Sequence, residues 1–113
     1  MIEIEAVDGV NLENFDHCMK VVESISGLAM YEQLAEEAAE LAHAALKLAR
    51  IGRGENPTPV TRLEAIIKVN EELSDLQLVC EVIGLKPDRQ IQVKKLKRWA
   101  QRIMEARKGG EDV

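Results

Sequence analysis

Aromatic residues are scarce in this chain, and long apolar runs are absent. Only Phe15, Tyr31 and Trp99 are aromatic among 113 residues, so a core must come mainly from Leu, Ile, Val and Ala, which favours packed helices. No apolar run is long enough to cross a membrane. The first ten residues carry three acidic side chains and no basic one, unlike a signal peptide. We therefore expect residues 1–113 to form a single soluble all-α domain in the cytoplasm.

Cysteine is also scarce. Cys18 and Cys80 stand alone, without the paired spacing of metal-binding or disulfide-rich domains. We interpret both as reduced thiols of a cytoplasmic protein, with a disulfide as the less favoured alternative. A Gly-x-x-x-x-Gly-Lys phosphate loop and a nucleophile elbow are both missing, and no serine has a plausible base partner. Phosphate-loop and serine-nucleophile chemistry are thereby disfavoured.

The net charge of −5 hides a strong asymmetry along the chain. Residues 1–85 hold 16 acidic and 6 basic side chains, whereas residues 86–108 hold 2 acidic and 9 basic. A mostly acidic surface argues against a nucleic-acid polymer as partner. The basic segment has two interpretations, which the sequence leaves open. It could face the phosphates of a small ligand, or it could be a solvated helix face that offsets the acidic helices.

Helical periodicity dominates the chain. Thr61-Arg-Leu-Glu64 has the form of a capping box at a helix start, and 52–59 is the clearest loop. Residues 1–10 could instead form a short strand. Helices are expected at 11–26, 28–51, from 59 or 61 to 84, and from 87 or 88 to 107. Four helices with one polar loop predict an all-α, four-helix bundle-like subunit.

Two features of these helices predict an oligomer. The second helix is rich in alanine, so another helix can approach it closely. The third is apolar on several sides, as buried helices are. In so short a chain, such burial is easiest when subunits associate, and we expect a homo-oligomer. The fourth helix should turn one apolar stripe inward, formed by Val93, Leu96, Ala100 and Ile103.

A pair of acidic doublets stands out within the apolar helices. Glu37-Ala-Ala-Glu40 and Glu72-Leu-Ser-Asp75 each place two carboxylates on one helix face. Two antiparallel helices could aim all four into one space. Clustered carboxylates at the margin of a core need a cation, and oxygen ligands favour Mg²⁺ or Mn²⁺. Glu36 and Glu71 precede the doublets as candidates for a second metal site or a water-activating base, with ordinary surface charge as the alternative.

A di-iron site is the competing metal hypothesis, because Glu40-Leu-Ala-His43 matches its Glu-x-x-His element. Such a site needs two of these elements. The other histidine, His17, has Asn14 three residues before it, and His43 is expected to point to solvent. We therefore disfavour this alternative.

Together, the strings Glu36-Glu37-Ala-Ala-Glu40-Leu41 and Glu71-Glu72-Leu-Ser-Asp75-Leu76 resemble the MazG-like all-α nucleoside triphosphate pyrophosphohydrolases. The resemblance covers about residues 28–104 and includes a basic closing helix. One departure is Ser74, where members often have glycine. The resemblance implies a hydrolase that cleaves a nucleoside or deoxynucleoside triphosphate between its α and β phosphates, giving the monophosphate and pyrophosphate. It also implies a homodimer or homotetramer.

By the same resemblance, Mg²⁺ is bound by Glu37, Glu40, Glu72 and Asp75. Glu36 or Glu37 would accept the proton of the attacking water. The substrate-binding candidates come from the basic closing helix: Lys94, Lys97, Arg98, Arg102 and Trp99. The alternative is a non-catalytic helical oligomerisation module, in which the acids and the basic helix pair across a subunit interface.

Overall fold

The computed structural model describes residues 12–57 and 59–111, and all of its regular structure in these ranges is helical. Four helices follow one another: α1 (Leu12–Ser24), α2 (Gly27–Gly52), α3 (Arg62–Val82) and α4 (Arg89–Glu111). This confirms the all-α, four-helix prediction. The possible strand at residues 1–10 lies outside the described residues. No helix in the described ranges is long and apolar enough to cross a membrane.

Side-chain caps fix the starts of the two central helices. The Ser26 hydroxyl oxygen accepts a hydrogen bond from the Ala29 amide at 3.2 Å, at the start of α2. At the start of α3, the Thr61 hydroxyl oxygen accepts one from the Glu64 amide at 3.1 Å. Each cap satisfies an amide that has no partner within the helix. The Thr61 cap is the one that the sequence predicted.

Glycine ends both central helices. Gly54 follows α2 with φ of 73°, and Gly84 follows α3 with φ of 78°. This left-handed conformation is costly for residues with a Cβ atom. Beyond Gly84, the Leu85 amide donates to the Cys80 carbonyl at 2.8 Å and closes the helix end.

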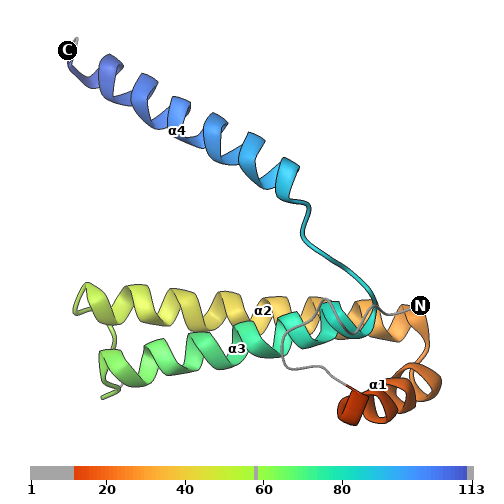
Figure 1. Cartoon of the computed structure of the whole chain (residues 1–113). Coiled ribbons are helices and arrows are strands. Elements are labelled where there is room, and N and C mark those ends of the chain that lie inside the picture. Colours follow the sequence, from red (N-terminus) through yellow and green to blue (C-terminus); the bar gives the residue numbers. More distant parts are fainter. Residues whose placement is uncertain (1–11, 58, 112–113) are drawn as a thin grey trace.

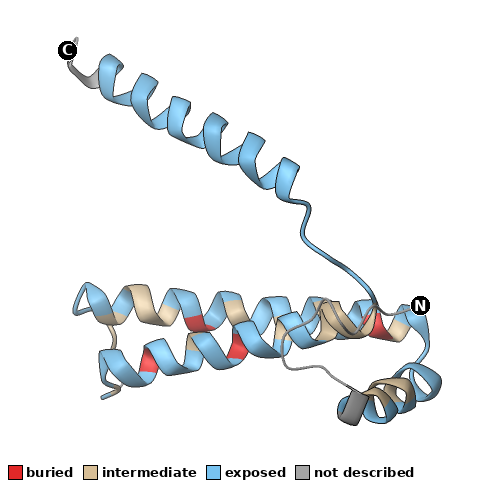
Figure 2. Ribbon diagram, in the orientation of Figure 1, coloured by how far each residue is buried: buried red, intermediate tan, exposed pale blue. Residues whose placement is uncertain are grey.

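An antiparallel hairpin of α2 and α3 is the main packed unit of the chain (Figure 1). Buried residues along it are few, and two of the four are alanines, Ala44 on α2 and Ala65 on α3 (Figure 2). Small side chains at these points allow the helices to approach closely. Met30 and Glu72 are the other buried residues. Cys18 on α1 and Cys80 on α3 both carry free thiols, as predicted.

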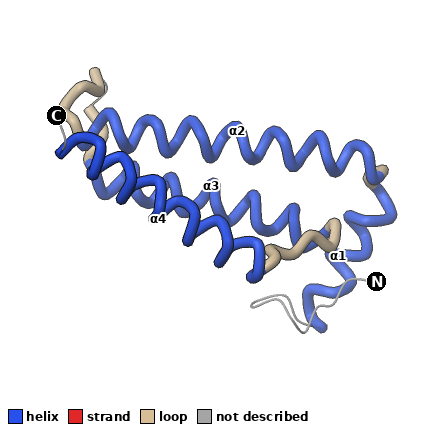
Figure 3. Tube along the Cα trace, turned by 90° about the horizontal axis from the view of Figure 1, so that it is seen from above, coloured by secondary structure: helices blue, strands red, loops and turns tan. Residues whose placement is uncertain are grey.

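The fourth helix stands away from the hairpin (Figure 1). Seen from above, it projects over α3 (Figure 3). Asp88 caps it, accepting from the Gln90 and Ile91 amides at 2.9 and 3.2 Å. The chain therefore extends over 60 × 40 × 25 Å, with a radius of gyration of 18.9 Å. A compact domain of this length would have a radius of about 13 Å.

The expected inward stripe of α4 is a wrong prediction for the single chain. Val93, Leu96 and Ile103 are exposed, Leu96 by 64%, and Ala100 is exposed as well. The apolar sides of α3 are likewise not covered within one chain, since Ile67 and Leu78 are about half exposed; their burial between subunits stays a prediction. The physical reason is that two long helices and the short α1 leave most of each helix surface uncovered. One chain does not close the bundle.

Candidate metal centre

The two acidic doublets meet in the middle of the hairpin. Glu37 and Glu40 come from α2, while Glu72 and Asp75 come from α3. Each offers one carboxylate oxygen, and these four oxygens lie within 4.8 Å of one another. The convergence expected from the spacing of the doublets is therefore present.

Burial is uneven among the four acids, and it leaves two oxygens without partners. Glu72 is only 6% exposed, Glu37 is half-buried, and Glu40 and Asp75 are exposed. The Oε2 atoms of Glu37 and Glu72 are buried and have no hydrogen-bond partner among the described residues. An unpaired buried carboxylate oxygen is costly. An oxygen-only set with two such atoms fits a hard divalent cation such as Mg²⁺ or Mn²⁺.

One lysine already compensates part of this negative charge. Lys68 Nζ lies 2.9 Å from Glu72 Oε1 and 3.8 Å from a carboxylate oxygen of Glu71. The hydrogen bond to Glu72 raises the pKa of Lys68. The same bond lowers the pKa of Glu72, against the opposing effect of burial, and a hydrogen bond with Glu40 lowers it further.

Glu40 is the acid whose pKa the cluster raises. Its hydrogen bond with Glu72 raises its pKa, and the charges of Glu37, Glu72 and Asp75, together with partial burial, act in the same direction. Glu40 therefore keeps its proton to a higher pH than an isolated glutamate would, as expected when four acids share too little positive charge.

Two neighbouring polar side chains are held in place by local contacts. Gln33 Nε2 donates to Glu37 Oε1 at 2.8 Å, which orients this carboxylate from one turn before it. The Ser74 hydroxyl donates to the Asn70 carbonyl at 2.7 Å. Ser74 is thus bound to its own helix, which makes it a poor candidate for a nucleophile.

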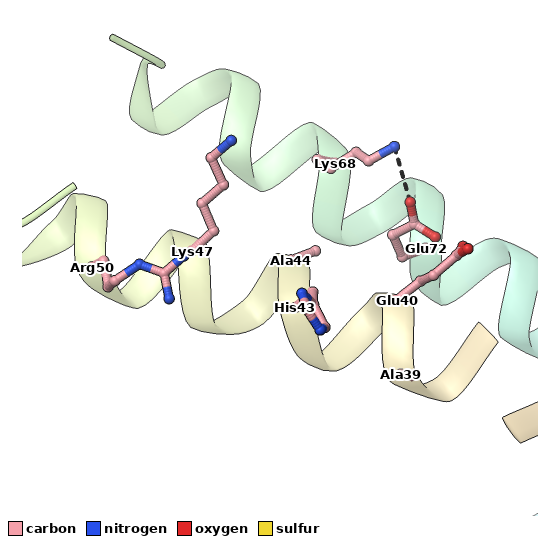
Figure 4. A pocket seen from close by; sticks show the side chains of 8 residues that line it. All are labelled: Ala39, Glu40, His43, Ala44, Lys47, Arg50, Lys68 and Glu72. Carbon is pink, nitrogen blue, oxygen red and sulfur yellow. Dashed lines mark ion pairs between the residues drawn. The ribbon is translucent and has the colours of Figure 1, made fainter. Parts of the chain in front are cut away.

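A hollow of about 450 Å³ opens beside the cluster, and Figure 4 shows the residues around it. Glu40 and Glu72 form its acidic part, while Lys47, Arg50 and Lys68 supply cations. Its lining residues are Ala39, Glu40, His43, Ala44, Lys47, Arg50, Lys68 and Glu72. A second hollow of about 420 Å³ is lined by Ile67, Asn70, Glu71, Ser74 and Asp75. Two acids of the cluster and three cationic side chains thus line the first hollow together.

Three other residues named from the sequence, Glu36, Glu71 and His43, lie on the hairpin outside the four-acid cluster. Glu36 is exposed and does not belong to the four-acid cluster. Glu71 is exposed, lines the second hollow and contacts Lys68. His43 is exposed, as expected, and lies on the rim of the first hollow. Only one Glu-x-x-His element reaches the site, which leaves the di-iron hypothesis without its second half.

The predicted substrate-binding residues on α4 are not brought to the acids within one chain. All are exposed, with Trp99 at 65%, and none lines either hollow: Lys94, Lys97, Arg98, Arg102 and Trp99. The reason is that α4 leaves the hairpin (Figure 1). If these residues act at the site, a second chain or another placement of α4 must bring them there.

The sequence patterns did not lead us to predict the three cations beside the acids, Lys47, Arg50 and Lys68. A signal for them existed, because Lys68 lies one helical turn before Glu72. Lys47 lies seven residues after Glu40, and Arg50 follows three later, so the three occupy one face of α2. Reading both helices for cations in phase with the doublets would have found them.

The fold and the site define the class of this molecule: an all-α helical hairpin that carries a candidate divalent-metal centre. No protein-family description, curated protein or solved structure matched the chain. The site is therefore interpreted from its own residues.

Proposed function

We propose that this protein is a Mg²⁺-dependent nucleoside triphosphate pyrophosphohydrolase, for which Mn²⁺ could substitute. The resemblance of the two motifs to the MazG-like enzymes suggests this activity. The observation that carries it is the convergence of four carboxylates within 4.8 Å, beside a hollow that also holds three cations. The products are the nucleoside monophosphate and pyrophosphate.

The residues that would hold Mg²⁺ are Glu37, Glu40, Glu72 and Asp75. The unpartnered Oε2 atoms of Glu37 and Glu72 support this set, because a bound cation would satisfy both. When bound, Mg²⁺ supplies charge neutralisation on phosphate oxygens and lowers the pKa of a bound water. Binding would also compete with protonation of Glu40, whose pKa the neighbouring acids raise.

Catalysis of phosphoryl transfer asks the chain chiefly for positioning and charge. Glu37 belongs to the cluster, and Gln33 fixes one of its oxygens. The other, Oε2, can serve either Mg²⁺ or the proton of the attacking water, so Glu37 would be the base only where Glu40, Glu72 and Asp75 hold the cation. Glu36 is exposed and lies outside the cluster. Lys68 offers an ammonium group at the boundary between the acids and the hollow, where it would meet phosphate oxygens.

A panel of nucleoside and deoxynucleoside triphosphates, incubated with Mg²⁺ or Mn²⁺, tests this proposal. We expect monophosphate and pyrophosphate from at least one substrate, and loss of this activity in Glu72→Gln. Glu32→Gln is the matched control, because Glu32 is an exposed acid of α2 outside the cluster. Absence of monophosphate across the panel would refute the enzyme hypothesis. Release of orthophosphate with a diphosphate product would contradict α–β cleavage specifically.

The second candidate is a non-catalytic helical oligomerisation module. The many exposed apolar side chains of α3 and α4 favour association of chains, and Lys68 already neutralises part of the acidic cluster. Association and catalysis are compatible, since the resemblance implies dimers or tetramers. Turnover separates the two candidates, because a module without enzymatic function would give no product.

A further inference from the structure

We infer that Lys47 and Arg50 bind the β and γ phosphates of the substrate. We call this pair of side chains the basic ridge. The triphosphate then runs from the acids toward the C-terminal end of α2. This inference rests on the proposed function and deepens it. It names the part of the substrate that this wall of the hollow recognises and the direction in which the substrate lies.

Both residues of the basic ridge lie in the same hollow as the acids and on the same helix as Glu40. Lys47 is half-buried and Arg50 is exposed. Figure 4 shows both on the α2 segment that follows His43, whereas Glu40 and Glu72 meet farther along the hairpin. The hollow therefore has an acidic end and a basic wall.

The cations of the basic ridge have no partner, unlike their neighbours. Neither side chain makes an ion pair or a hydrogen bond with another described residue. In contrast, Lys68 pairs with Glu72 at 2.9 Å, and Arg53 pairs with Glu55 at 3.5 Å. Two unpaired cations on one wall of a concave surface provide donors for an anion, and the Arg50 guanidinium can bind phosphate oxygens in a bidentate manner.

The order of the acids and cations along α2 sets the direction in which the bound triphosphate lies. The helical rise places Lys47 about 10 Å and Arg50 about 15 Å beyond Glu40 along the axis of α2. These distances join backbone positions, and a triphosphate is shorter than either, so the long side chains of Lys47 and Arg50 would have to reach back toward the acids to meet its β and γ phosphates. An orthophosphate held at the acids would be too short to meet them. The phosphate to be attacked must lie at the acids, where the metal would be held. The other two phosphates then follow the cations, with the nucleoside away from the basic ridge.

Calorimetric titration of inorganic pyrophosphate and of orthophosphate, each in excess Mg²⁺, tests the basic ridge without requiring turnover. The key variant combines Lys47→Met with Arg50→Gln, which keeps the side-chain stems and removes both charges. Lys20→Met is the matched control, because Lys20 is an exposed cation of α1, outside the hollow. A Lys47→Arg variant tests rescue by charge.

We expect the original protein to bind pyrophosphate more tightly than orthophosphate. The double variant should weaken pyrophosphate binding at least about tenfold, as loss of hydrogen bonds to charged groups does, and lose the preference over orthophosphate. Lys20→Met and Lys47→Arg should bind as the original does. In turnover assays, kcat/KM for the triphosphate should fall by at least a similar factor in the double variant.

The outcomes of the binding test and the activity test are separable. Ridge-dependent binding of pyrophosphate by a protein that cleaves no triphosphate would refute the proposed enzyme and support the basic ridge as a polyphosphate site. Cleavage that persists with unchanged kcat/KM in the double variant would overturn the basic ridge and leave the enzyme. Pyrophosphate binding that is absent in the original protein, or equal in the double variant, would also overturn the basic ridge.

Discussion

Glu72 has the most constrained environment of the acids in the hairpin. It is buried, contacts Lys68 through one oxygen, and has no hydrogen-bond partner for the other. The ion pair with exposed Lys68 stabilises the fold little, because water screens that side of it. Burial of the Glu72 carboxylate opposes it. Glu72 is thus the residue at which a metal site and a structural ion pair predict different behaviour.

The first prediction concerns Glu72→Gln. In chelator, the variant should melt close to the original protein, because it loses both an ion pair that water screens on the Lys68 side and one charge of the acidic cluster, while shape is nearly kept. Mg²⁺ should raise the melting temperature of the original protein. A ligand at a hundredfold excess over its Kd adds about 2.7 kcal/mol to the free energy of unfolding. The variant should lose most of this response, as thermal melts in chelator and in Mg²⁺ would show.

The opposite outcome of these melts would identify a structural role for Glu72. A variant that melts lower in chelator, together with an original protein that does not respond to Mg²⁺, would mean that Glu72 serves a structural ion pair and that no shared metal site exists. Glu32→Gln controls for the loss of one negative charge outside the cluster.

The second prediction concerns pH and Glu40. Its pKa in the folded protein is raised above the ordinary value of 4.5. The folded state therefore binds more protons than the unfolded state in that window, so Glu40 contributes stability below pH 4.5 that is lost as pH rises through its folded pKa. Glu72, with a lowered pKa, contributes in the opposite direction.

Glu40→Gln isolates this effect. In chelator, the free energy of unfolding of the original protein should fall relative to that of the variant as pH rises from 4.5 toward neutrality. Denaturant titrations at several pH values measure the difference. A difference that does not change with pH, or that changes with the opposite sign, would mean that the pKa of Glu40 is not raised in the folded protein.

At the scale of single helices, local signals decide where each element begins. The Thr61 hydroxyl satisfies the Glu64 amide, and α3 then carries Glu72 and Asp75 in phase toward α2. We predict that Thr61→Ala lowers the free energy of unfolding by about 1 kcal/mol, the usual cost of losing such a cap. Thr61→Ser keeps the hydroxyl and should cost much less. Equal losses in denaturant titrations would show that the cap hydroxyl contributes nothing.

At the scale of the whole molecule, the exposed apolar faces require an explanation. Leu96 and Trp99 are each about two thirds exposed in a single chain. We predict that the protein is at least a dimer in light scattering at micromolar concentration, with α4 covered by a second chain. A compact monomer would contradict this.

Leu96→Glu sharpens the test of assembly. If α4 is covered, this substitution should dissociate the oligomer and shift the emission of Trp99, the sole tryptophan, toward that of a solvent-exposed indole. Gln101→Glu is the control, since Gln101 is an exposed polar residue of the same helix. An unchanged mass and emission in Leu96→Glu would show that α4 stays uncovered.

The sequence by itself determined the helices and the meeting of the acids. Helix starts and ends depend on contacts between residues a few positions apart, such as Thr61 with Glu64, so short-range patterns predict them. The convergence follows almost as directly. Glu40 and Glu72 are equally far from Asn56 in the connecting loop, and so are Glu37 and Asp75. An antiparallel hairpin folded about that loop brings each pair to the same level along its axis, and the position of the doublets at the margin of the core turns them toward the neighbouring helix.

Only the tertiary structure decided which acid is buried, which cations join the site and where α4 lies. The burial of Glu72 and its contact with Lys68 depend on how closely α2 approaches α3 through Ala44 and Ala65. The departure of α4 could not be predicted from its apolar stripe. The periodicity of apolar residues predicts that one face of a helix will be buried, but not which surface will cover it. Distant surfaces of this chain and of other chains compete to cover that face.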